Sequence, residues 1–184
     1  MPTNHHVLAI SGSLRSGSTS TSVLRTAKQV APRAVSVTIF EGLGQLPPFN
    51  PDDDIDPLPP GVQTLRAACG AADSLLLSTP EYAGALPGSF KNLLDWTVGG
   101  TELSGLPVAW INVSVSPTGA VAAHEELRRV LGFVEADVVD AACIDLAVPR
   151  ASVGPDGLVE PGPLRDRIGE VLKALAAHAR ATTA

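Results

Sequence analysis

Short apolar runs alternate along the chain with segments in which apolar residues recur every three or four positions. The runs are continuous and rich in Val, Ile and Leu, which is typical of parallel strands buried on both faces. They predict five strands, at residues 7–10, 35–40, 74–78, 108–115 and 141–148. The segments between them have the period of helices with one apolar face, and their apolar positions cover residues 23–31, 61–71, 90–97, 127–134 and 164–175.

The strict alternation of strands and helices indicates consecutive βαβ units around one parallel sheet. We therefore expect a three-layer, doubly wound α/β fold with a five-stranded parallel sheet. Folds of this kind bind ligands beyond the carboxyl ends of their strands, so these loops are where chemistry is expected. A chain of 184 residues is long enough for one complete core, and we expect a single domain over residues 1–184.

The loop after the first strand, residues 11–22, is rich in serine, threonine and glycine and leads into a helix. Helix N-termini attract anions, because unpaired N–H groups and the positive end of the helix dipole meet there. Hydroxyl groups and Arg15 add donors that suit a phosphate. Ser18 stands where a nucleotide triphosphatase loop needs lysine, and Leu14 stands where a dinucleotide fingerprint needs its second glycine. The loop therefore predicts a compact site for one phosphate, as in a mononucleotide.

The loop after the third strand, from Ser78 to about Trp96, combines an irregular backbone with one aromatic side chain. Prolines and glycines shape the backbone, and Tyr82 stands at the strand end. Such a loop can offer backbone N–H and C=O groups to a heterocycle, while the ring of Tyr82 packs near its plane. Pro87 is placed to open the helix that follows.

Composition and charge exclude several functions. The net charge of −6, without a lysine or arginine cluster, argues against a nucleic-acid surface. No apolar stretch reaches the roughly 20 residues of a membrane span, and the first residues do not resemble a signal peptide, so we expect a cytoplasmic protein. The aspartates of the proline-rich segment 46–60 lack the glycine and glutamate of a calcium loop and predict a solvated surface loop.

The cysteines and histidines do not form a recognisable catalytic motif. Cys69 and Cys143 fall in predicted helix and strand segments, where they are expected to be small buried hydrophobes. Two histidines precede the first strand and two fall in helical segments, where we expect them to be solvated: His5, His6, His124 and His178.

Taken together, Gly12-Ser-Leu-Arg-x-x-Ser18 and Thr79-Pro-Glu-Tyr-x-Gly-x-x-Pro-Gly-x-x-Lys-Asn-x-x-Asp-Trp96 resemble the NADPH-dependent FMN reductase family. The resemblance implies a flavodoxin-like fold that binds FMN, with relatives that reduce quinones, azo compounds, chromate or free flavin. It also implies a homodimer or homotetramer. The family's helix includes the pairs Lys91-Asn92 and Asp95-Trp96, which we assign to packing or subunit contacts.

The resemblance also implies a set of FMN-binding residues. The phosphate would be held by Ser13, Arg15 and Ser18 with Thr19 and Ser20, and the ring by Pro80, Glu81, Tyr82, Ala83 and Gly84, chiefly through their backbone. In the loop after the fourth strand, Ser116 and Gly119 match the family. Two positions depart from it, because Ser20 and Ala83 stand where relatives usually have asparagine.

The activity implied by the resemblance is electron transfer from NADPH or NADH through FMN to a small acceptor. Hydride transfer to a flavin needs no acid or base from the protein, so we expect no catalytic side chain and no metal. A flavodoxin-like electron carrier, or a flavin-binding partner protein without turnover of its own, is the alternative. A phosphatase or kinase is disfavoured because the phosphate loop lacks the lysine and has no cysteine or aspartate nucleophile nearby. The acceptor and the choice of nicotinamide stay open, with Arg15 and Arg150 as candidates for the 2′-phosphate of NADPH.

Overall fold

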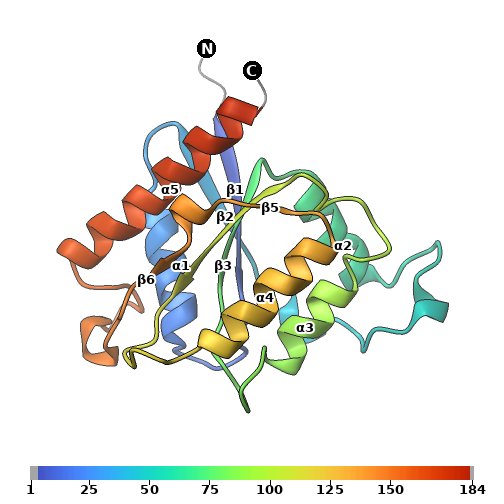
Figure 1. Cartoon of the computed structure of the whole chain (residues 1–184), viewed down its shortest axis with the longest axis horizontal. Helices are drawn as coiled ribbons and strands as arrows, with labels where there is room; N and C mark the ends of the chain where they lie inside the picture. The colour runs from blue at the N-terminus through green and yellow to red at the C-terminus, as the bar shows by residue number, and fades with distance from the viewer. Residues whose placement is uncertain (1–3, 183–184) are drawn as a thin grey trace.

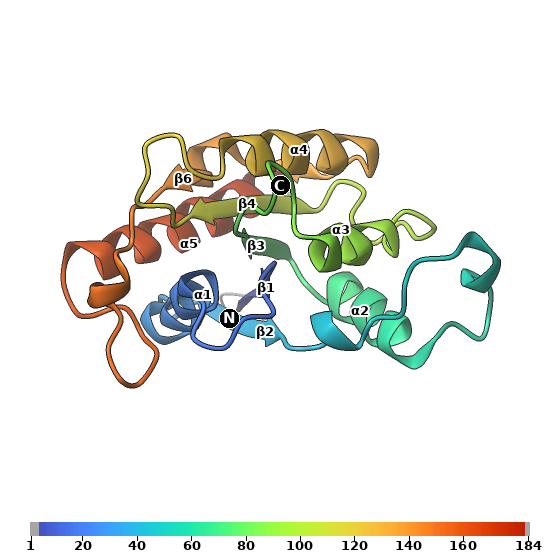
Figure 2. The ribbon, with the colours of Figure 1, turned by 90° about the horizontal axis from the view of Figure 1, so that it is seen from below.

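A parallel sheet lies between two layers of helices in a computed structural model that describes residues 4–182 (Figures 1 and 2). The strands run in the order β2-β1-β3-β4-β5, and a further short strand, β6, also pairs with β4. This is the doubly wound α/β fold that the hydrophobic pattern predicts. The strands are β1 (His5–Ser11), β2 (Val35–Phe40), β3 (Ser74–Ser78), β4 (Pro107–Asn112), β5 (Asp137–Val138) and β6 (Ile144–Asp145).

Helices α1 and α5 cover one face of the sheet, and α2, α3 and α4 cover the other (Figure 2). Their bounds are α1 (Thr19–Val30), α2 (Pro60–Gly70), α3 (Gly88–Asp95), α4 (Val121–Phe133) and α5 (Pro163–Thr182). Pro87 is the N-cap of α3, one position before the helix begins. Four short 3-10 helices lie in the connections: η1 (Leu43–Gln45), η2 (Pro51–Asp53), η3 (Asp140–Ala142) and η4 (Arg150–Ser152).

The central strand β1 shows why the apolar runs are continuous. Val7 and Ala9 pack into the core under α1 and α5, while Leu8 and Ile10 pack into the core under α2, α3 and α4. Both faces of the strand are therefore buried, which requires apolar side chains at successive positions.

The fifth strand differs from its prediction. We expected one strand over residues 141–148, but this side of the sheet holds the two-residue strands β5 and β6 with the 3-10 turn η3 between them. The predicted segment still follows β4 in part, because Leu146 donates its N–H to Asn112 O at 2.8 Å and Val148 to Val113 O at 3.2 Å. Leu146 and Val148 are buried under α5, and this burial produces the apolar pattern of the sequence.

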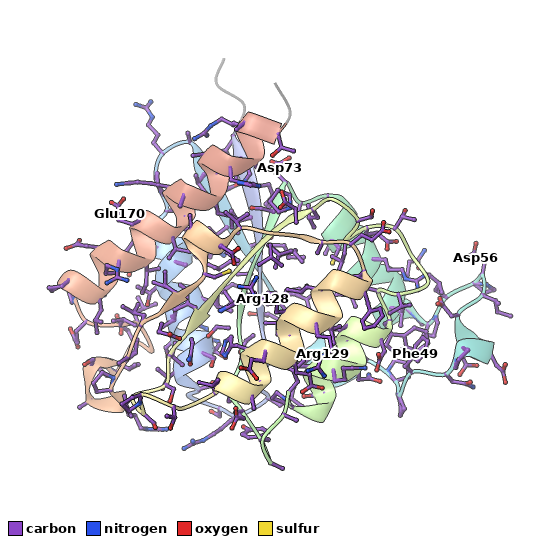
Figure 3. The ribbon with its side chains drawn as sticks, in the orientation of Figure 1. Phe49, Asp56, Asp73, Arg128, Arg129 and Glu170 are labelled. Atoms are coloured by element: carbon purple, nitrogen blue, oxygen red, sulfur yellow. The ribbon has the colours of Figure 1, made fainter. Side chains whose placement is uncertain are left out.

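The proline-rich loop after β2 is fastened to α3 by the residues we assigned to packing. Pro47 O accepts hydrogen bonds from Asn92 Nδ2 at 2.9 Å and Trp96 Nε1 at 2.8 Å. Phe49, labelled in Figure 3, meets the Trp96 ring edge-on with centroids 5.0 Å apart. Further along the loop, Asp54 forms a 2.7 Å ion pair with Arg66 of α2, so this aspartate is held by a guanidinium.

The histidines correct two expectations. His5 and His6 lie within β1, and His5 is buried with its Nε2 2.9 Å from Ser74 Oγ. His124 is buried rather than solvated, and its Nδ1 lies 2.6 Å from Ala120 O. His178 is half-buried and lies 2.6 Å from Asp137 Oδ2. None of these contacts reaches the loops at the carboxyl ends of β1 and β3.

Candidate functional site

The loops that follow β1, β3 and β4 lie together along one edge of the sheet, at the bottom of Figure 1. The parallel register brings them there, because Ser11 at the end of β1 is paired with Ser78 at the end of β3. The β1 and β3 loops, predicted separately from the sequence, thus become neighbours in the fold.

Gly12 and Thr79 make the direct contact between the first two loops. Gly12 donates its N–H to Ser78 O at 2.9 Å. A Cβ at Gly12 would overlap Thr79 Oγ1 and lie 2.6 Å from Thr79 Cβ, so only glycine lets the loops come this close. The first glycine of the motif therefore serves close packing of one loop on the other.

Helix α1 begins at Thr19 with its first N–H groups unpaired within the helix. Ser18 is the N-cap, and its side chain makes no capping hydrogen bond. The first bond inward runs from Ser22 N to Ser18 O at 2.9 Å. The amides of residues 19–21 therefore precede the helical hydrogen bonds and face the end of the helix, together with the positive end of its dipole.

A pocket of about 400 Å³, here called the α1 pocket, opens at this helix end. It brings together all five residues predicted for a phosphate and two predicted for a ring. Its lining consists of Ser13, Arg15, Ser18, Thr19, Ser20, Pro80, Tyr82, Val113, Ser114, Val115, Val148 and Arg150. Ser20, which departs from the family's asparagine, is 2% exposed and still belongs to the lining.

A second pocket of about 370 Å³, the β4 pocket, adjoins the first and shares Pro80, Val113 and Ser114 with it. Its other lining residues are Thr79, Glu81, Asn112, Gly119 and Ala120. Gly119 must lack a side chain, because a Cβ there would overlap Ser114 Oγ. Asn112 Nδ2 donates to Gly119 O at 3.1 Å and fixes the loop after β4 across this pocket.

Ala83 and Gly84, which we expected to line the ring site, form a hairpin tip outside both pockets. Both are exposed, have positive φ angles of 53° and 74°, and line neither pocket. They form the tip of a tight hairpin closed by Tyr82 N to Ala85 O at 3.0 Å and Ala85 N to Tyr82 O at 3.1 Å. Two successive positive φ values are typical of a type I′ turn, in which Asn-Gly is preferred. The asparagine usual in relatives at position 83 thus suits the backbone conformation.

The side chain of Glu81 contacts α4. Glu81 Oε2 accepts the N–H of Ala123 at 3.0 Å in the first turn of α4, whose own N-cap residue, Ala120, has no side-chain cap. In return, Glu126 of α4 accepts the N–H of Leu86 at 2.7 Å. These two bonds, here called the glutamate clasp, tie the loop after β3 to α4 at both ends.

Two further residues are Ser116, which was predicted to bind FMN, and Arg150, which was not. Ser116 is exposed and lines neither pocket, and its part is to accept the N–H of Gly119 at 2.9 Å. Arg150, which the sequence offered only for a 2′-phosphate, lines the α1 pocket with Arg15. The sequence held an indication of this position, because Arg150 follows the predicted end of the fifth strand by two residues, and ligands bind beyond strand ends.

The charges around the α1 pocket favour an anion. None of its lining residues is acidic, although the chain carries a net charge of −6. The cysteines lie outside both pockets, and burial raises the pKa of Cys69 to about 12 and that of Cys143 to about 11. Both thiols are thus protonated near neutral pH and are poor nucleophiles.

Comparison with known proteins places these features in a family. Residues 5–147 match the model of the NADPH-dependent FMN reductase family. The chain is 32% identical over 171 residues to an NAD(P)H-dependent FMN reductase of Pseudomonas aeruginosa, covering 92% of each protein. It is 31% identical over 137 residues to a quinone reductase of Escherichia coli, covering 73% of each. Among solved structures, the flavoenzyme NAD(P)H:(acceptor) oxidoreductase FerB of Paracoccus denitrificans shares the fold with a TM-score of 0.74 at 24% identity, over 95% of this chain and 98% of that one.

Proposed function

Because the chain belongs to the NADPH-dependent FMN reductase family, we propose that its α1 pocket holds the phosphate of FMN and its β4 pocket lies along the flavin ring. The protein is an oxidoreductase that uses FMN and a nicotinamide. When bound, FMN supplies the redox chemistry, accepting a hydride from NADPH or NADH and giving electrons to a small acceptor.

The observation that carries this assignment is the contact of the two loops at Gly12 and Thr79. It joins a helix end rich in hydroxyl donors to the β4 pocket, with lining residues shared between the two pockets. Each pocket lies within the range of about 300–1,000 Å³ that is usual for small-ligand sites. A molecule with a phosphate at one end and a flat ring at the other fits this arrangement.

The chain's own residues then have distinct tasks. The N–H groups of residues 19–21, the hydroxyls of Ser13, Ser18 and Ser20, and the Arg15 guanidinium bind the phosphate. The glutamate clasp orients the loop that carries Pro80 and Tyr82. The residues of the loops after β3 and β4 that line the β4 pocket would lie along the ring.

The substrate proposed as acceptor is a quinone, because relatives of this chain are quinone reductases. Azo compounds, metal oxyanions and free flavin are the other acceptors to compare. A cytoplasmic location, one domain over the whole chain and a homodimer or homotetramer remain proposals from the sequence. Within residues 4–182, no helix combines the length and apolar character needed to cross a membrane.

The test is steady-state oxidation of NADPH and of NADH by the purified protein with FMN and a benzoquinone, without any added protein. We expect turnover that depends on FMN. Protein that neither binds FMN nor oxidises either nicotinamide contradicts the assignment. Protein that binds FMN and turns over only when a partner protein is added is the electron carrier of the alternative hypothesis.

A further inference from the structure

Arg150 lies on the α1 pocket, although it comes from a part of the chain far from the phosphate loop in sequence. It begins η4, and it lines the pocket with Arg15, Ser13 and Ser18. One terminal nitrogen of its guanidinium is 3.6 Å from the position that a Cβ on Gly17 would take. The Arg150 side chain therefore lies beside the phosphate loop itself.

We propose that Arg150 is a second cation of the FMN phosphate site, held against α1 by the hydroxyl of Thr26. This inference rests on the proposed function, because it assigns a ligand to the same pocket. The family match ends at residue 147, so the match itself assigns no role to Arg150.

The pocket's charges support two cations for one ligand. None of the ion pairs formed among residues 4–182 involves Arg15 or Arg150, and no lining residue of the α1 pocket is acidic. Two guanidinium groups therefore face one pocket without a carboxylate to neutralise them. A phosphate monoester near neutral pH carries between one and two negative charges and three acceptor oxygens, which matches two guanidinium groups and a helix end.

The segment that carries Arg150 is fixed to α1. After η4 the chain forms a short hairpin in which Val153 pairs with Val159. Val159 is fully buried, and its N–H donates to Thr26 Oγ1 at 2.9 Å. Thr26 in turn donates its hydroxyl to Ser22 O at 2.7 Å, one turn into α1. The helix whose N-terminus forms the pocket and the segment that presents Arg150 are thus joined by buried hydrogen bonds.

The alternative for Arg150 is the 2′-phosphate of NADPH. Its pocket neighbours favour FMN, because they are the serines and threonine at the N-terminus of α1. A residue reserved for the nicotinamide would have to contact its ligand beyond the FMN phosphate, whereas Arg150 approaches the loop that surrounds that phosphate.

The test compares dissociation constants of flavin-free Arg150→Gln and wild-type protein, measured by quenching of FMN fluorescence. The control is Arg129→Gln on α4, which removes the same charge from an exposed arginine that lines neither pocket (Figure 3). Loss of a charge-assisted contact to phosphate should weaken FMN binding about tenfold or more, and the loss should shrink at high salt. Riboflavin, which lacks the phosphate, should bind wild type and Arg150→Gln equally.

Thr26→Val tests separately whether Thr26 positions the segment that carries Arg150. It removes the acceptor of the Val159 N–H and should weaken FMN binding in the wild-type background, but add little in the Arg150→Gln background. Independent effects of the two changes contradict the role of Thr26 in placing Arg150.

The outcomes separate the inference from the function on which it rests. Equal FMN affinity in Arg150→Gln and Arg129→Gln overturns the role of Arg150. A higher KM for NADPH but not NADH, with FMN affinity unchanged, also overturns it and assigns Arg150 to the nicotinamide. Failure of the wild-type protein to bind FMN overturns the proposed function instead.

Discussion

The glutamate clasp gives a prediction that joins stability to cofactor binding. In Glu81→Ala, α4 loses the carboxylate that accepts the Ala123 N–H at 3.0 Å, and the helix has no capping side chain of its own. Loss of a capping acceptor costs about 1 kcal/mol. Loss of a negative charge beside a helix N-terminus costs about a further 0.5 kcal/mol at a half-exposed position. The free energy of unfolding should fall by about 1.5 kcal/mol.

The assay is thermal unfolding of flavin-free protein at neutral pH. For a chain of this length, the loss corresponds to a decrease in Tm of about 3–6 °C. Glu125→Ala is the matched control, because it removes a carboxylate from the same helix at an exposed position. Glu81→Gln should recover part of the loss, since its amide oxygen can still accept the Ala123 N–H without the charge.

The same change should weaken FMN binding several-fold, because the clasp also anchors the loop that carries Pro80 and Tyr82. Glu125→Ala should leave the dissociation constant of FMN unchanged. If Glu81→Ala and Glu125→Ala unfold at the same temperature, the carboxylate of Glu81 does not cap α4 and the reasoning is refuted.

Three further predictions follow from single positions. Ala83→Asn should raise Tm by roughly 2 °C, because asparagine tolerates the φ of 53° better than alanine; an unchanged or lower Tm would contradict the turn assignment. Arg15→Ala should weaken FMN binding far more than Arg25→Ala, which lies outside the α1 pocket, and equal dissociation constants would remove Arg15 from the site. Burial lowers the pKa of His124 below 6.5, so the unfolded chain binds the proton first and stability falls as the pH drops below that value. The Tm of His124→Leu should therefore decrease less than the Tm of wild type between about pH 8 and about pH 5. An identical decrease would exclude His124 as a cause of the loss of stability at low pH.

The sequence predicted most of the fold because both faces of the sheet are buried. β2 and β3 have the predicted bounds, and the continuous apolar runs reflect side chains that alternate between two cores. The β5 and β6 strands were not predictable in the same way. Ala142, Leu146 and Val148 are apolar because they pack under α5, and burial alone does not reveal where hydrogen bonding to β4 is interrupted by η3.

At the candidate site, the sequence predicted loops that come together in the fold but not how each side chain points. Residues of the first loop gather as expected because they follow one another into α1. Glu81 and Ala83 both belong to the loop after β3, yet Glu81 caps α4 and Ala83 forms a hairpin tip. The role of Glu81 depends on the position of α4, and that of Ala83 depends on a positive φ. The spacing of the motif predicts neither of these features.

Arg150 shows what a motif alone leaves out and why the sheet supplies it. The N–H groups of Leu146 and Val148 bind Asn112 O and Val113 O, so the chain after η3 runs beside the end of β4 toward the edge where the other loops meet. Pro149 then begins the turn that presents Arg150. Any parallel neighbour of β4 must deliver its next residues to this edge, whatever their sequence. A cation such as Arg150, two positions after the last of these hydrogen bonds at Val148, is therefore delivered to the phosphate site by the topology of the sheet, although the strand itself is broken into pieces.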